Sequence, residues 1–365
     1  MIIYMEPKKQ ELHYGAERGE KQFQEAEVYV EQVLETIDNE QLRDFLVQQL
    51  KPAGFSEELL RGKFYPTDMV TTESKSSTAA AWANGEKINF EGTAFLQSCH
   101  NVLLNINQNN PPQDGLERDR QFFDVAKIQA LQTFVHEQLH HLTFTKYSYK
   151  KQEAQDGSVK KEVWNRKVGL ESQIVIERTV QKNEDGDSED SIESDTRLFS
   201  RGLNEGLTEL MAQQFAKEYI RQYSVTEDVQ LTQRVVDSWV ESGAYKAERI
   251  KIEQLAVVLA EMTEVPEDFM LKSFFHEYVT NGDLLPPEFE DVFAGYVPDG
   301  IDDDQVEAGI AAFRRSLSVG SFYAKSPVND RLTDLIGLFP KEKADRCRAR
   351  LAEIMQKYYP SAKYE

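Results

Sequence analysis

Apolar residues recur at three- and four-residue spacing along most of this chain, which is the spacing that places them on one face of an α-helix. The clearest stripe covers residues 128–142 and consists of Ile128, Leu131, Val135, Leu139 and Leu142. A second stripe covers residues 203–215 and consists of Leu203, Leu207, Leu210, Met211 and Phe215. The pattern predicts one helix in each segment, each with a buried face.

Helical periodicity also covers both ends of the chain. Residues 20–62 show it, with a break at Pro52-Ala53-Gly54, and so do five segments near the C-terminus: 231–240, 250–262, 266–279, 305–317 and 341–358. We therefore predict three regions, namely an N-terminal helical region (1–75), a central region (76–224) and a C-terminal helical lobe (225–365).

The central region contains strand-like patterns as well. Residues 79–90 carry Asn84-Gly85 between two strand-like runs, which is typical of a β-hairpin. Residues 161–181 alternate apolar and polar side chains around a turn at Gly169, and residues 64–78 are polar enough to predict a loop. The expected fold class is α+β, mostly helical, with a small antiparallel or mixed sheet.

Charge and cysteine content narrow the class of protein. The 42 basic and 63 acidic residues give a net charge of −21, which argues against binding to nucleic acid or to an anionic membrane. Two cysteines cannot form a disulfide framework, and the neighbouring Cys99 and His100 are expected to be a partly buried pair without chemistry. With no secretory signal and no long apolar run, the sequence favours a cytoplasmic protein.

Residues 184–195 form a strongly acidic run. Seven of these twelve residues are Asp or Glu and none is basic, which favours a solvated flexible loop. A calcium-binding loop is the alternative, although Gly186 is misplaced for the EF-hand pattern.

The first stripe contains the motif His-Glu-x-x-His. His136 and His140 are four residues apart, so on a helix their imidazoles lie one above the other and can bind one metal ion. Glu137 follows His136 and is the candidate general base. His141 is turned about 100° from His140 around the helix and is not expected to be a ligand.

The second stripe supplies the missing ligand. A catalytic zinc ion takes three protein ligands, and Glu205 within Asn204-Glu205-Gly206 is the candidate for the third. Glu209 lies one turn further along the same face, where it can accept a hydrogen bond from the outer ring nitrogen of a ligand histidine.

These two motifs resemble those of the gluzincin group of zinc metallopeptidases, which includes the thermolysin-like enzymes, and the resemblance covers residues 77–220. It implies a zincin-like catalytic core in which His136, His140 and Glu205 bind Zn²⁺, Glu137 is the general base and Glu209 supports a histidine. The gap of 65 residues between His140 and Glu205 is long for this group, and thermolysin-like enzymes carry aspartate at the position of Glu209.

The resemblance implies a peptide or protein substrate that pairs with an edge strand, here residues 79–83 or 87–90; an ordinary surface hairpin is the alternative. Gluzincins often place a transition-state-stabilising His or Tyr in the C-terminal lobe, where His276 and Tyr278 occur, but the polar surroundings of His276 favour an exposed residue without a catalytic role. A catalytically silent zincin-fold binding or scaffold protein is the alternative function. Cleavage specificity, endo- or exopeptidase action and oligomeric state do not follow from the sequence.

Overall fold

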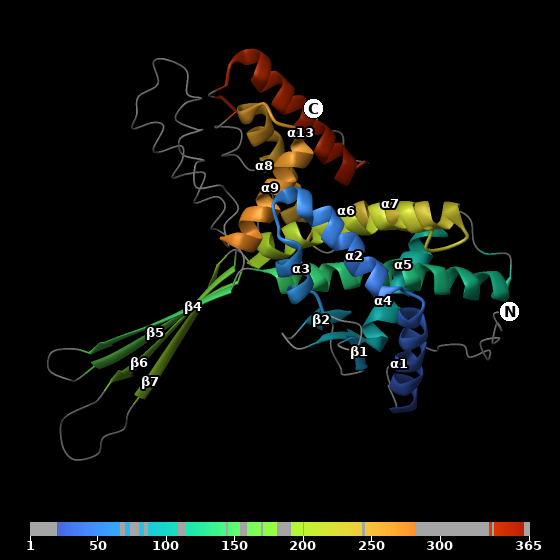
Figure 1. Ribbon diagram of the computed structural model, residues 1–365, viewed down its shortest axis with the longest axis horizontal. Helices are drawn as coiled ribbons and strands as arrows, with labels where there is room; N and C mark the ends of the chain where they lie inside the picture. Colours follow the sequence, from blue (N-terminus) through green and yellow to red (C-terminus); the bar gives the residue numbers. More distant parts are fainter. Residues whose placement is uncertain are drawn as a thin grey trace.

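The computed structural model of the chain is mostly helical, with two separate sheets (Figure 1). It describes the following residues: 20–65, 70–73, 80–83, 87–108, 112, 114–143, 145–153, 159–168, 171–180, 191–199, 201–242, 245–281, 336–337 and 339–360. The predicted helical content and the small mixed sheet are therefore present.

The N-terminal region is helical, as predicted. It consists of α1 (Glu20–Glu35), α2 (Asn39–Leu50), the 3-10 turn η1 (Lys51–Ala53) and α3 (Glu57–Lys63). Asp38 and Ser56 cap α2 and α3, because their side chains accept hydrogen bonds from backbone amides three residues later. The predicted break occurs at Gly54, whose φ of 96° is a conformation that side chains other than glycine rarely adopt.

The small sheet has three strands, β1 (Val70–Glu73), β2 (Ala81–Ala83) and β3 (Ile88–Glu91), in the order β1-β3-β2. The antiparallel β2–β3 pair confirms the predicted hairpin, although its Asn84-Gly85 turn is outside the described residues. Two expectations were wrong. A strand, β1, lies inside the predicted loop at 64–78, and residues 88–90 cannot be an edge because β3 is the central strand.

Helix α4 (Gly92–Ile106) follows β3 directly, and α5 (Gly115–Leu142) is the longest helix among the described residues. The side chain of Asp114 caps α5 by accepting a 2.8 Å hydrogen bond from the Glu117 amide. From Val125 to Leu142 most positions are buried, on several sides of the helix. The prediction of a single buried face was therefore too narrow, because α5 runs through the interior with helices and the small sheet packed around it (Figure 1).

The second sheet is an antiparallel arm formed by β4 (Thr145–Glu153), β5 (Val159–Val168), β6 (Glu171–Val180) and β7 (Ser191–Phe199), in sequential order. Figure 1 shows the arm projecting from the helical body. It occupies the long interval between the two motifs, since β4 begins five residues after His140 and β7 ends six residues before Glu205. The wide separation of the motifs is thus an insertion that returns the chain close to its point of departure.

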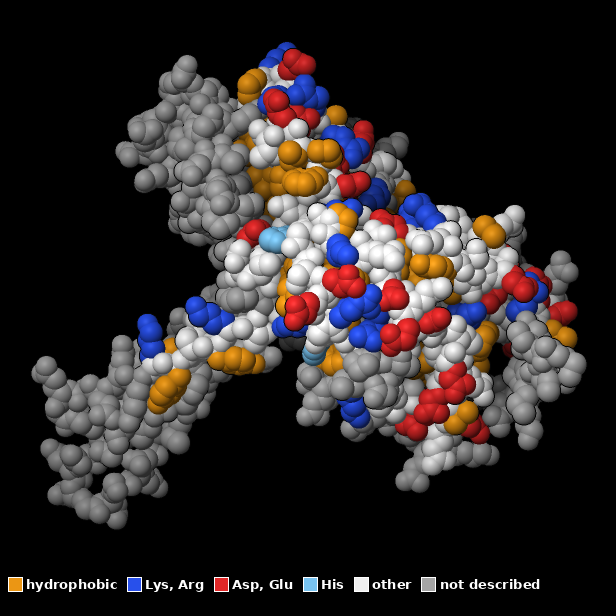
Figure 2. Space-filling view, viewed as in Figure 1, with side chains coloured by type: hydrophobic (Ala, Val, Ile, Leu, Met, Phe, Trp, Pro, Cys, Tyr) orange, Lys and Arg blue, Asp and Glu red, His pale blue; other side chains and the backbone are white. Residues whose placement is uncertain are grey.

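The arm confirms the predicted strands at 161–181 and corrects the expectation for the acidic run. Residues 184–190 are outside the described part, but Ser191 to Asp195 form the start of β7, paired with β6. The strand pairing therefore includes two of the seven acidic residues of the run, Glu193 and Asp195. On β4, Tyr147 and Tyr149 are 69% and 52% exposed, and Figure 2 shows hydrophobic and basic side chains along this part of the arm.

The chain continues through α6 (Arg201–Tyr223), α7 (Val229–Ser242), α8 (Lys246–Thr263), α9 (Glu267–Thr280) and α13 (Lys341–Tyr358), which match the predicted helical segments. The segment 305–317 is outside the described residues. One hydrophobic core extends from the N-terminal helices through α5 and α6 into α8 and α9, so all three predicted regions contribute to it. Every helix in the described part is too short or too polar to cross a bilayer.

Candidate metal centre

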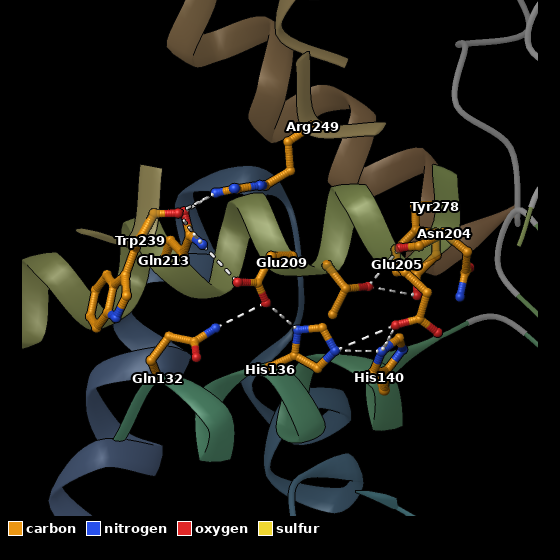
Figure 3. Close-up of polar contacts among 11 residues, drawn as sticks. Gln132, His136, His140, Asn204, Glu205, Glu209, Gln213, Trp239, Arg249 and Tyr278 are labelled. Atoms are coloured by element: carbon orange, nitrogen blue, oxygen red, sulfur yellow. Dashed lines mark hydrogen bonds and ion pairs between the residues drawn. The ribbon is translucent and has the colours of Figure 1, made fainter. Parts of the chain in front are cut away.

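Two adjacent helices, α5 and α6, bring the three predicted ligands together (Figure 3). Nε2 of His140 lies 2.9 Å from Nε2 of His136 and 3.1 Å from Oε2 of Glu205. Nε2 of His136 lies 3.5 Å from the same carboxylate oxygen. The structure therefore places one donor atom from each of the three residues around a common point.

The donor set fits a zinc ion. Ligand atoms bonded tetrahedrally at about 2.0–2.1 Å stand about 3.3 Å apart, and the three observed separations lie on either side of that value. Two imidazoles and a carboxylate also match the ligand types of catalytic zinc sites. The side chains of His136, His140 and Glu205 are 12%, 19% and 16% exposed, so the centre is reachable from solvent.

Glu209 lies behind His136, on the side away from the other ligands. Its Oε2 is 2.9 Å from Nδ1 of His136. An ionised carboxylate accepts but does not donate, so the neutral imidazole carries its proton on Nδ1 and directs the lone pair of Nε2 at the centre. The contact therefore favours the tautomer that binds a metal, through the charge of the carboxylate at short range rather than through an aligned hydrogen bond.

The electrostatics of the centre favour a cation. Burial opposes a charge on His136, but contacts with Glu205 and Glu209 and the charge of Glu137 outweigh it and raise the pKa of His136 to about 10. Burial likewise opposes the charge of Glu205, yet the hydrogen bonds and charges of His136 and His140 hold the pKa of Glu205 well below its usual range. Without metal, a proton on the imidazole supplies the positive charge that a bound cation would otherwise supply.

Glu137, the predicted general base, and His141, which is not expected to be a ligand, both lie on α5. Glu137 is on α5 and 8% exposed, and its charge acts on His136. The ring of His141 packs against Tyr65, with centroids 3.9 Å apart, and burial and Lys63 lower its pKa. His141 is not part of the ligand group, as expected.

The two C-terminal-lobe candidates are not brought together at the metal centre. His276 packs against Phe55 at a centroid distance of 5.1 Å and its side chain is 33% exposed, so it is more buried than expected. Tyr278 is fully buried and its hydroxyl lies 2.7 Å from Oγ1 of Thr143 and 3.2 Å from Oγ1 of Thr208. Since Thr208 donates to the Asn204 carbonyl, Tyr278 connects the end of α5 to the turn of α6 that carries Glu205.

Cys99 is buried in α4, and burial raises the pKa of its thiol, which suppresses the reactive thiolate. His100, its neighbour on the helix, is partly buried. The sequence predicted a partly buried pair, but the thiol of Cys99 is fully buried. Nothing in the geometry of these two residues indicates nucleophilic chemistry.

Sequence reasoning missed the glutamines around the centre. Gln132 donates to Oε2 of Glu209 at 2.9 Å, and Gln213 donates to Oε1 of Glu209 at 2.6 Å. Gln138, inside the first motif, donates to the Tyr65 carbonyl and accepts from the Tyr65 amide, which fixes α5 to the N-terminal region. Four-residue spacing from His136 and Glu209 was the available signal for Gln132 and Gln213.

Gly206 sets how closely α6 approaches α8. A Cβ atom at this position would lie 2.6 Å from Cβ of Glu248 and 3.2 Å from the backbone nitrogen of Arg249. Because Gly206 follows Glu205, an added side chain would force α6 away from α8 and displace a ligand.

We therefore expect Gly206→Ala to lower the free energy of unfolding by about 1–3 kcal/mol, the usual cost of overpacking. Urea unfolding of the metal-free protein measures this. Gly62→Ala is the matched control, because a Cβ at Gly62 in α3 meets nothing within 4 Å and alanine favours a helix. Equal free energies of unfolding for Gly206→Ala and Gly62→Ala would show that α6 and α8 can move apart without loss of stability, which would contradict this prediction.

Comparison of the whole chain with family models, with curated proteins and with solved structures gives no match. The function of the chain is therefore argued from the site.

Proposed function

We propose that this protein is a zinc-dependent peptidase. The observation that carries the proposal is the convergence of His136 Nε2, His140 Nε2 and Glu205 Oε2 from two helices, all within 4.8 Å of one another. A buried ion pair of His136 with Glu205 and Glu209 would account for one histidine, but it would leave unexplained why Nε2 of His140 meets the same carboxylate oxygen of Glu205.

We assign the roles from the convergence of the three ligands and from the place of Glu137 next to His136 in the motif. When bound by the three ligands, Zn²⁺ lowers the pKa of a coordinated water towards neutrality and polarises a substrate carbonyl. Glu137 takes a proton from the attacking water and transfers it to the leaving amine. Glu209 keeps the Nδ1 proton of His136 in place while Nε2 serves the metal.

The small sheet supplies a binding mode for an extended peptide. Among the described strands β2 has one neighbour only, and it lies beside α5, the helix with both histidines. An extended chain can add to such an edge through backbone hydrogen bonds, which recognise a polypeptide with little demand on its side chains. The proposed substrate is accordingly a peptide or an unfolded protein segment.

The proposal is tested by metal content together with cleavage. One zinc ion per chain is expected by elemental analysis of protein purified without added chelator. Incubation with a mixed proteome digest should create new peptide termini that disappear with a chelator and return with Zn²⁺. A protein that binds no zinc would overturn the proposal, and zinc without cleavage of any peptide would favour the catalytically silent binding protein.

A further inference from the structure

The C-terminal lobe buries a positive charge close to the metal centre. Arg249, on α8, has no exposed surface although arginine is almost never fully buried unless it is paired. Nε and Nη2 of its guanidinium have no hydrogen-bond partner among the described residues. Burying a guanidinium with unsatisfied donors opposes folding. The burial of Arg249 therefore requires an explanation, which its hydrogen bonds provide.

Both of these hydrogen bonds come from Nη1. One goes to Oε1 of Gln213 at 2.5 Å, and the other to the carbonyl of Trp239 at 3.1 Å. On its other side, the guanidinium lies over the ring of Tyr358 in α13, 5.4 Å from the centroid. Arg249 thus contacts α7 through Trp239 and α6 through Gln213 (Figure 3), and it contacts α13 through the ring of Tyr358.

The contact with Arg249 determines which way the Gln213 amide faces. Arginine can only donate, so the amide oxygen must face Arg249 and the amide nitrogen must face away from it. That nitrogen donates to Oε1 of Glu209 at 2.6 Å. With the amide reversed, its oxygen would face the carboxylate of Glu209, and the two would repel.

A continuous set of contacts therefore leads from Arg249 through Gln213 and Glu209 to His136. Gln213 and Gln132 donate to different oxygens of Glu209, and His136 Nδ1 lies 2.9 Å from Oε2. The carboxylate of Glu209 is consequently held in one orientation.

We propose that Arg249 is a positioning residue for the metal centre: it fixes the Gln213 amide, and through it the carboxylate of Glu209 on His136. This inference rests on the proposed function, because it assigns Arg249 a purpose relative to a bound metal. It also gives the C-terminal lobe a role in the site without contributing a ligand.

Zinc affinity tests the proposal, measured by competition with a chromogenic chelator on folded protein. Arg249→Met removes the donors and the charge but keeps much of the volume, and Gln213→Leu removes the next link. Each is expected to raise the zinc Kd by about 10- to 100-fold, as loss of outer-shell support usually does. Because Arg249 acts through Gln213, the zinc Kd of the double variant should not exceed the higher of the two Kd values of the single variants.

Ile250→Ala is the matched control for general loosening. Ile250 is the buried neighbour of Arg249 on α8 and packs in a cluster with Tyr358 to which Gln213 does not belong. It should unfold at lower urea than the wild type and keep the wild-type zinc Kd. Wild-type affinity in Arg249→Met, or a loss no larger than that of Ile250→Ala, would overturn the positioning role. If Arg249→Met does not fold, the zinc Kd of Gln213→Leu is compared with that of Ile250→Ala instead, because Gln213 is only half-buried.

A metal-free measurement separates this inference from the proposed function. In urea unfolding, Arg249→Met should lower the midpoint less in a Glu209→Gln background than in the wild type, because the anion that it compensates is gone. Equal shifts in both backgrounds would exclude the link between Arg249 and Glu209. A wild type that binds no zinc would overturn the proposed function, while the urea comparison would still decide whether Arg249 acts on Glu209.

Discussion

Glu137→Gln protein is expected to retain its fold and its zinc and to lose peptide hydrolysis by about 10²–10⁴-fold, the range for loss of a general base. Glutamine keeps the size of glutamate, so the packing of this 8% exposed position on α5 is preserved. The amide cannot accept a proton from the attacking water. Because Glu137 is outside the ligand group, the zinc content should stay at the wild-type value.

The measurement is kcat/KM on a peptide found in the digest screen, together with zinc content of the same preparation. Gln138→Glu would be a poor comparison, because Gln138 makes two buried hydrogen bonds to Tyr65. His141→Gln is a better matched control on the same helix, since its ring faces Tyr65, and it should retain activity. Cleavage by Glu137→Gln at the wild-type rate would disprove the role of the base while leaving the metal site intact.

Loss of any one ligand is the second large effect. His136→Ala, His140→Ala and Glu205→Ala are each expected to abolish stoichiometric zinc and all activity that depends on it, because two remaining ligands hold zinc weakly. The two histidine variants should remain folded, since both imidazoles are partly exposed and the buried apolar positions of α5 are unchanged.

Elemental analysis after dialysis against a weak chelator measures this effect. His141→Ala is the control, and it should keep one zinc ion per chain although it loses its contact with Tyr65. Glu209→Gln should be intermediate, with zinc bound more weakly by about 10- to 100-fold, because Glu209 contacts His136 without being a ligand. Stoichiometric zinc in Glu205→Ala would show that the third ligand has been assigned wrongly.

The sequence predicted those features that depend on neighbouring residues along the chain. Helices α2 and α7 follow the apolar spacing, and the spacing of His136, His140, Glu205 and Glu209 places each pair on one helix face. These relations hold within one or two helical turns. They do not depend on which other segment packs nearby, so the candidate ligands could be named before the fold was known.

The arm shows where that reasoning fails. The exposed residues Thr145 to Lys150 of β4 offer only Tyr147 and Tyr149 as apolar positions, and the start of β7 carries two acidic residues, so neither segment shows the longer apolar alternation that predicts a strand. Both are strands because they pair in register with β5 and β6. Pairing satisfies the backbone hydrogen bonds whatever the side chains are, and it depends on partners 10 or more residues away along the chain.

By itself the sequence determined the helices and the chemical identity of the candidate metal ligands, because helical spacing is a local property of the chain. Only the tertiary structure decided that α5 and α6 lie side by side, so that the carboxylate of Glu205 comes within 3.1 Å of His140 across an interval of 65 residues. It alone showed that Arg249, from a third helix, is buried against Gln213. Such contacts depend on the packing of a shared core, and no spacing along the chain encodes them.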